Sequence, residues 1–119
     1  MVYLGSSLAL AALATLVHAP RFKLLEESYV YFEVTAPDEL LLELDPTDLP
    51  ADWRAAEIPK STQPIGDAWY RSRASLLLSV PSRVMPQERN VLLNPEHPES
   101  SKVELRGPLE FKFDERLET

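Results

Sequence analysis

Hydrophobic and polar positions follow different patterns in different parts of the chain. Residues 29–34 alternate aromatic or branched residues with polar ones, which is typical of a half-buried strand. Residues 76–80 form a short apolar run flanked by turn residues, which predicts a central strand buried on both faces. Residues 2–4 indicate the end of a further strand. The chain therefore contains at least one sheet.

Two segments are predicted to be helical. Residues 8–18 are apolar almost all round, which predicts a helix buried against a sheet, with Ser6 or Ser7 at its N-cap. Residues 65–72 are predicted to form a second helix that carries Trp69 on its inner side.

The remaining apolar runs are short. Residues 40–44 fit either a strand or a helical turn. Residues 103–105 and 109–113 predict a closing hairpin around Gly107 and Pro108. Strands that alternate irregularly with two helices predict an α+β fold.

Composition narrows the class of protein. With 119 residues the chain is expected to form a single domain, residues 1–119, with a core that needs neither disulfides nor a metal ion. Cysteine is absent, which fits the reducing cytoplasm. The two histidines lie far apart in the sequence, so we expect no metal site.

The net charge is −7. A negative net charge argues against direct nucleic-acid binding and suits a partner with a basic surface. Residues 8–19 are too short to span a bilayer, and no Lys or Arg precedes them as in a signal peptide. We therefore expect a buried helix there and no membrane association.

Ser82 follows the predicted central strand and lies between Pro81 and Pro86. Prolines fix the backbone, so a serine held in this way points its hydroxyl in a defined direction, as a reaction site requires. The alternative is a loop serine that caps nearby backbone. Asn90 and Asn94, further along, can likewise satisfy their own turns.

Several segments together resemble the RES-domain family, the toxins of bacterial toxin–antitoxin pairs. The signature-like run is VPSRVMPQERNVLLNPEHP, and the opening VYLGSSLALAALATLVHA is similar to the family's tyrosine-bearing strand and Ala/Leu-rich helix. Further similar segments are LPADW, STQPIGDAWYRSRASLLLSVPS and FKFDERL. The resemblance covers nearly the whole chain, and the order of the segments is more specific than any one of them.

The resemblance implies an ADP-ribosyltransferase-like fold, with a mixed, strongly bent β-sheet and few helices. It implies degradation of NAD by phosphorolysis or glycohydrolysis, with NAD as the substrate and no bound cofactor. It also implies a cytoplasmic protein that a helix-turn-helix antitoxin of the Xre type neutralises. Whether the chain forms a homodimer stays open.

The resemblance also assigns site residues. Ser82 matches the family serine, and Tyr3 matches a tyrosine that packs on the nicotinamide end of NAD. Asn90 and Asn94 are expected to shape the cofactor-binding loop beside the serine. Ala14 stands where the family has a glutamate. The family arginine lies in a Gly-Arg-Trp segment upstream of the tyrosine, which this sequence lacks.

These departures bear on activity. Cleavage of the glycosidic bond of NAD develops positive charge on the ribose, which a carboxylate stabilises and Ala14 cannot. We therefore expect impaired NAD degradation and a cleft lined by both Tyr3 and Ser82. Whether the chain is an active enzyme stays open. The alternatives are a non-catalytic protein that binds the antitoxin, or a truncated fragment of an active toxin.

Overall fold

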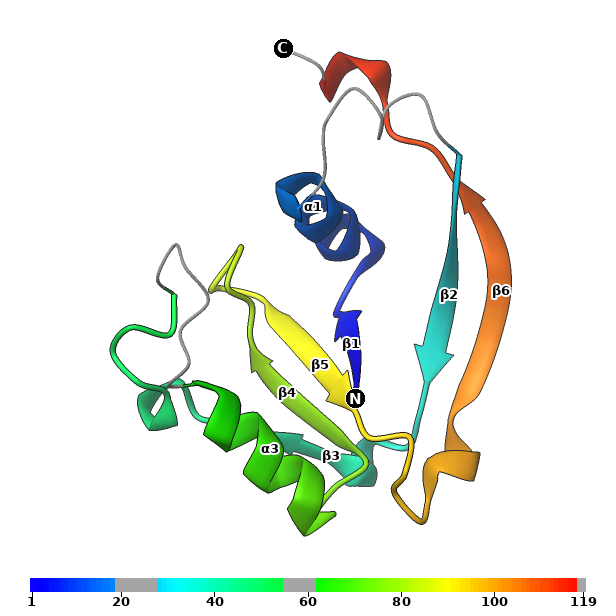
Figure 1. Ribbon diagram of the computed structural model, residues 1–119. Coiled ribbons are helices and arrows are strands. Elements are labelled where there is room, and N and C mark those ends of the chain that lie inside the picture. The colour runs from blue at the N-terminus through cyan, green and yellow to red at the C-terminus, as the bar shows by residue number, and fades with distance from the viewer. Residues whose placement is uncertain (19–27, 55–61, 118–119) are drawn as a thin grey trace.

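A computed structural model describes residues 1–18, 28–54 and 62–117 of the protein (Figure 1). The described residues form two α-helices, six β-strands and several short 3-10 turns. In chain order the helices and strands are β1 (Val2–Gly5), α1 (Leu8–His18), β2 (Tyr29–Thr35), β3 (Leu41–Glu43), α3 (Gln63–Ser72), β4 (Leu77–Pro81), β5 (Arg89–Leu93) and β6 (Glu104–Phe111). This arrangement confirms the α+β class.

Four of the strands form a mixed sheet in the order β1-β5-β4-β3. Strand β4 is parallel to β3 and antiparallel to β5, and β5 is antiparallel to β1. Leu77 and Leu78 of β4 are buried, which confirms the predicted central strand. The 40–44 segment resolves into both of its predicted forms, because a 3-10 turn at Asp38–Leu40 leads directly into β3.

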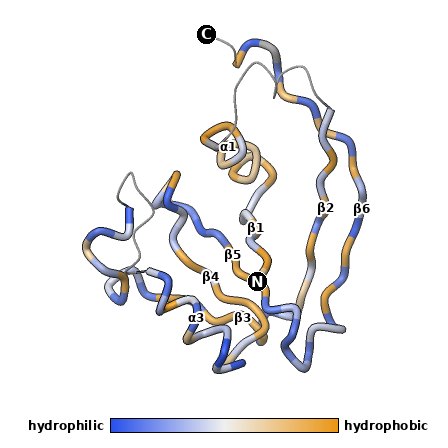
Figure 2. Tube along the Cα trace, viewed as in Figure 1, coloured by the Kyte–Doolittle hydropathy of each residue, from blue (hydrophilic) through white to orange (hydrophobic). Residues whose placement is uncertain are grey.

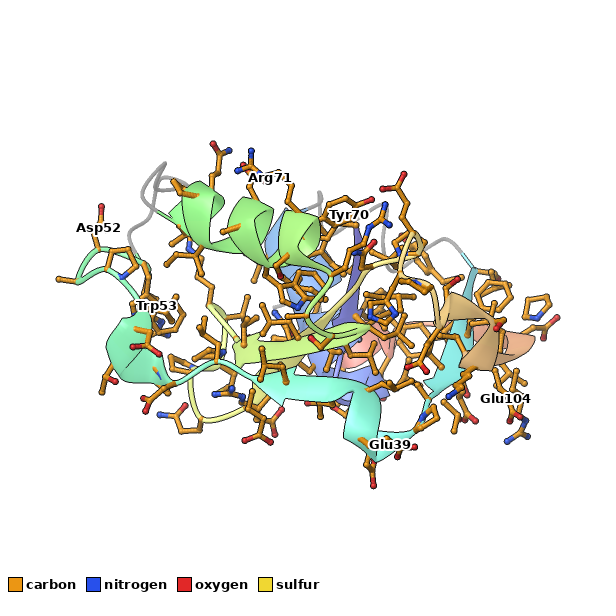
Figure 3. The ribbon with its side chains drawn as sticks, turned by 90° about the horizontal axis from the view of Figure 1, so that it is seen from below. Glu39, Asp52, Trp53, Tyr70, Arg71 and Glu104 are labelled. Atoms are coloured by element: carbon orange, nitrogen blue, oxygen red, sulfur yellow. The ribbon has the colours of Figure 1, made fainter. Side chains whose placement is uncertain are left out.

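Helix α3 covers one face of this sheet (Figure 3). Trp69 on its inner side is buried and packs with Leu78 and Leu92, as the sequence predicts. The indole Nε1 of Trp69 donates a 2.8 Å hydrogen bond to the hydroxyl of Ser75, so its polar atom is satisfied inside the core. Arg73 ends the helix in the left-handed conformation that commonly terminates helices.

The other two strands, β2 and β6, form a separate antiparallel sheet. Both alternate between hydrophobic and hydrophilic residues along their length (Figure 2). The predicted hairpin around Gly107 and Pro108 is wrong, because β6 runs straight through both residues. The register shifts between Tyr31 and Glu33, so Gly107, at φ +139°, and Pro108 are taken up in a bulge rather than in a chain reversal.

Helix α1 is less buried than its composition predicts. Ser7 caps it, because the Ser7 hydroxyl accepts a 3.1 Å hydrogen bond from the amide of Leu10. Leu10 is its one buried side chain among those described, and Val17 remains 59% exposed. The helix packs instead through Ala12 and Leu16 against the aromatic cluster around Phe113, near the ends of β2 and β6. The helix therefore packs against a sheet as expected, but most of its described side chains stay partly or fully exposed.

Candidate functional site

A cavity of about 650 Å³ lies where β1 and the start of α1 face β2. Its size falls within the range of small-molecule sites. Its walls come from three parts of the fold that are distant in the sequence. Strand β1 and the α1 start contribute Tyr3–Leu8 and Ala11, strand β2 and the residue beyond it contribute Tyr31–Val34 and Ala36, and the four-stranded sheet contributes Leu41, Leu77 and Val91.

Polar groups are few in this wall. Tyr3 lines the cavity and is 74% exposed, so its ring is open to a ligand. Tyr31 and Glu33 lie across the cavity on β2. Glu33 is the one charged residue among the described residues that line it. Its carboxylate contacts the guanidinium of Arg106 at 3.3 Å, and both side chains are largely exposed.

The N-terminus of α1 opens onto the same cavity through Ser6, Ser7 and Leu8. Gly5 allows this close approach, because a Cβ at that position would lie 3.1 Å from the amide nitrogen of Ala11. The amides of the first helical turn carry a partial positive charge. A cavity without a Lys or Arg in its described wall therefore still offers a place for an anionic group.

Ser82 directly follows β4, at a strand end as the sequence predicts, but it does not line the cavity. Its side chain is buried, and its hydroxyl accepts a 3.2 Å hydrogen bond from the amide of Met85. Its own amide donates to the carbonyl of Glu88 at 2.9 Å. The strand register places Ser82 at the same end of the sheet as Ser6, whose amide bonds the carbonyl of Arg89. The structure thus shows Ser82 organising the β4–β5 loop.

The two asparagines also lie outside the cavity wall. Asn90 is half-buried in β5, opposite Gly5 on one side and Val80 on the other. Asn94 is only 1% exposed. Its side-chain Nδ2 donates to the backbone carbonyl of Tyr70 at 3.2 Å, and its side-chain Oδ1 accepts from the backbone amide of Glu96 at 3.0 Å, so Asn94 joins α3 to the segment after β5.

Ala14 lies one helical turn beyond Ala11, the last residue of α1 in the cavity wall. It is half-buried and does not itself line the cavity. A longer side chain at this position would extend from the same face of the helix as Ala11. The structure therefore brings Tyr3 to the cavity, sets Ala14 beside it, and leaves Ser82, Asn90 and Asn94 in supporting positions.

Sequence reasoning missed the contribution of β2. Tyr31 and Glu33 carried no motif, and the alternation of β2 predicted a strand without saying what it faces. The bulge opposite Gly107 lies beside this segment, and bulges are common beside functional sites, but it is a feature of strand pairing that the sequence alone does not show. Only the three-dimensional arrangement shows that β2 and Tyr3 line the same cavity.

Comparison with known proteins agrees with this α+β architecture. Residues 1–114 match the RES domain. Toxin Res of Yersinia enterocolitica is 42% identical over 118 residues, which cover 98% of this chain and 76% of the relative. Prs ADP-ribosylating toxin of Sphingobium sp. is 35% identical over 120 residues, covering 98% and 74%, and Toxin Res of Photorhabdus laumondii is 35% identical over 117 residues with the same coverage.

The chain belongs to the RES-domain family. Within the described residues no helix has the length and apolar character needed to cross a membrane.

Proposed function

We propose that this protein is a RES-domain toxin whose cavity binds NAD, and that it degrades NAD slowly. The observation that carries the proposal is the cavity between β1, α1 and β2, with Tyr3 on one wall and a helix N-terminus on another. A cavity of about 650 Å³ accommodates a ligand of nucleotide size. The absence of cysteine is compatible with a cytoplasmic toxin.

The nicotinamide and the diphosphate of NAD each have a partner in this arrangement. The exposed ring of Tyr3 offers a flat apolar surface for the nicotinamide. The amides at the start of α1 offer donors for the diphosphate, next to Ser6. Leu4, Leu77 and Val91 supply the apolar floor.

The reaction breaks the bond between the nicotinamide nitrogen and the ribose carbon. Nicotinamide leaves with the electron pair of that bond, and water or phosphate adds to the ribose. Positive charge develops on the ribose, and a carboxylate lowers the barrier by stabilising it. Ala14 supplies no charge at the position of the family glutamate. We therefore expect slow turnover.

Calorimetric titration of the purified protein with NAD tests the proposal. Tyr3→Ala should weaken NAD binding at least tenfold, because one aromatic contact is lost. Tyr70→Phe is the matched control, since Tyr70 is a tyrosine of α3 outside the cavity wall, and it should leave binding unchanged. Absence of NAD binding by the unmodified protein, or equal loss in both variants, would contradict an NAD site here.

A second candidate function is non-catalytic binding of a helix-turn-helix antitoxin. A specific observation favours a protein partner: large apolar side chains of β2 and β6 are exposed, with Val30 at 60%, Phe32 at 53% and Leu105 at 68%. The net charge of −7 suits the basic surface of a DNA-binding protein. Co-purification with a cognate helix-turn-helix protein tests this function. A homodimer would cover the same surface and is detected by light scattering.

A further inference from the structure

One face of the sheet formed by β2 and β6 is turned toward α1. Tyr29 of β2 and Phe111 of β6 are paired across this sheet. Both side chains pack against Phe113, which also contacts Ala12 and Leu16 of α1. The face that carries Tyr29 is therefore the inner face of the sheet.

Glu33 lies on this inner face. Alternate residues of a strand project from the same side of its sheet, so Tyr31 and Glu33 share the side of Tyr29. Val30 and Phe32 project from the other side, and both are more than half exposed. Figure 1 shows the start of β2 level with α1 and its end level with β1. Glu33, in the second half of β2, therefore carries its side chain on the side of the cavity that it lines together with β1.

The carboxylate of Glu33 is accessible to a ligand. One of its oxygens, Oε2, accepts a 3.3 Å hydrogen bond from Nη1 of Arg106. The side chain of Glu33 is 51% exposed and that of Arg106 is 73% exposed. An exposed ion pair of this kind contributes little free energy, so it rearranges easily when a ligand enters. Arg106 itself is not among the described residues that line the cavity.

Only Glu33 brings a full negative charge to the described wall of the cavity. In the proposed NAD site the nicotinamide lies on Tyr3, and Glu33 lies across the cavity from Tyr3. Because the ribose is bonded directly to the nicotinamide, positive charge develops on the ribose between these two walls. The amides at the start of α1 carry partial positive charge and cannot stabilise it. Among the groups of the described wall, Glu33 therefore has the sign that the reaction requires.

We propose that Glu33 is a catalytic carboxylate of this protein. When the bond between the nicotinamide nitrogen and the ribose carbon breaks, nicotinamide keeps the electron pair and Glu33 stabilises the positive charge left on the ribose. An oxygen of water or phosphate then bonds to the ribose carbon. Where water adds, one of its protons passes to Glu33 and from there to the solvent. This inference rests on the proposed NAD site, and it accounts for turnover that is slow rather than absent.

Two measurements on the purified, full-length chain separate the role of Glu33 from the NAD site itself. Calorimetric titration measures the affinity for NAD, and release of nicotinamide at saturating NAD measures turnover. Glu33→Gln keeps the shape of the side chain and removes its charge. This variant should release nicotinamide at least tenfold more slowly, because the charge acts on the transition state. Its affinity for NAD should stay within about threefold of the unmodified protein.

Glu110→Gln is the matched control. Glu110 is an exposed glutamate of β6 that is paired with Val30, and it lies outside the cavity wall. The same chemical change at this position should leave both turnover and affinity unchanged. Both glutamates are exposed, so both variants should fold, which circular dichroism verifies.

The outcomes distinguish the two proposals. Equal turnover in Glu33→Gln and the unmodified protein would overturn the role of Glu33 and leave the NAD site standing. NAD binding without any nicotinamide release by the unmodified protein would do the same. A loss of NAD affinity in Glu33→Gln as large as the loss of turnover would also overturn it, because Glu33 would then act in binding rather than in bond cleavage. Absence of NAD binding by the unmodified protein would overturn the NAD site and this role together.

Discussion

Arg89 on β5 reaches across β4 and donates a 2.8 Å hydrogen bond to the carbonyl of Leu44, the residue that follows β3. On the way its Nε donates to the hydroxyl of Ser79 at 2.9 Å and its Nη2 to the carbonyl of Ser79 at 3.0 Å. One side chain therefore links three neighbouring strands of the mixed sheet. The Arg89 side chain thereby helps to hold the short strand β3, which pairs with β4 over only three residues.

Replacement of Arg89 should therefore destabilise the sheet. Arg89→Met keeps most of the apolar stem and removes all three hydrogen bonds, which should lower the free energy of unfolding by about 2–3 kcal/mol. Urea unfolding measures the change. Arg106→Met is the control, because its exposed ion pair with Glu33 should contribute less than about 1 kcal/mol. Equal losses in the two variants would show that the Arg89 bonds add nothing specific.

Ser82→Ala should act on stability rather than on ligand binding. The substitution leaves the amide of Met85 without its acceptor in a partly buried loop and should cost about 1 kcal/mol. NAD affinity should not change, since Ser82 lies outside the cavity wall. Ser101→Ala, at an exposed serine, controls for the loss of a hydroxyl. Loss of NAD turnover with unchanged stability would instead support the catalytic role that the family resemblance implies.

Ala14→Glu should increase NAD turnover. A carboxylate one turn beyond Ala11 would reach toward the cavity and stabilise positive charge on the ribose, which should raise the rate by roughly a hundredfold. Full activity should not return, because the described wall holds no cation for the diphosphate. Thr15→Glu is the control, because Thr15 is exposed on another face of α1. Release of nicotinamide is the measurement, and equal rates in both variants would contradict the role of position 14.

Tyr70 should titrate above the ordinary range of tyrosine. Its hydroxyl donates a 2.8 Å hydrogen bond to a carboxylate oxygen of Glu96, and this bond raises the pKa of Tyr70. The folded state therefore favours the protonated phenol. The stabilisation of the folded state by the Tyr70–Glu96 hydrogen bond is fully present below about pH 10, the ordinary pKa of tyrosine. This stabilisation is lost as the pH rises through the raised pKa of Tyr70. Ultraviolet titration measures this, and Glu96→Gln should bring the pKa back toward its ordinary value.

The local elements could be predicted from the sequence because each has a local signal. The alternation of hydrophobic and polar residues predicted β2, and the run of apolar residues predicted β4. Trp69 indicated which side of α3 faces the core. The hairpin failed because Gly and Pro signal a chain reversal in most contexts, whereas Gly107 and Pro108 here form a bulge within one strand. Whether Gly107 and Pro108 form a chain reversal or a bulge depends on the partner strand β2, which the local sequence does not contain.

The site was harder to predict because it is assembled from distant segments. Tyr3 was singled out by resemblance and lines the cavity, and its neighbours across the cavity come from β2. Asn94 was expected to shape the loop beside Ser82, but it lies at the opposite end of β5 from that serine, where it joins Tyr70 to Glu96. The burial of α1 was overestimated from its composition. Apolar residues allow a helix to be buried, but they do not determine how many other elements pack around it.

The pairing of β1 with β5 sets a time constraint on folding during synthesis. Val2 lies opposite Leu93, so β1 cannot pair with β5 until residues 3–93 have been made. At ribosomal rates this delay is on the order of ten seconds. Throughout that interval β1 has neither of its edges covered, and the nascent chain must avoid pairing with other chains until β5 emerges.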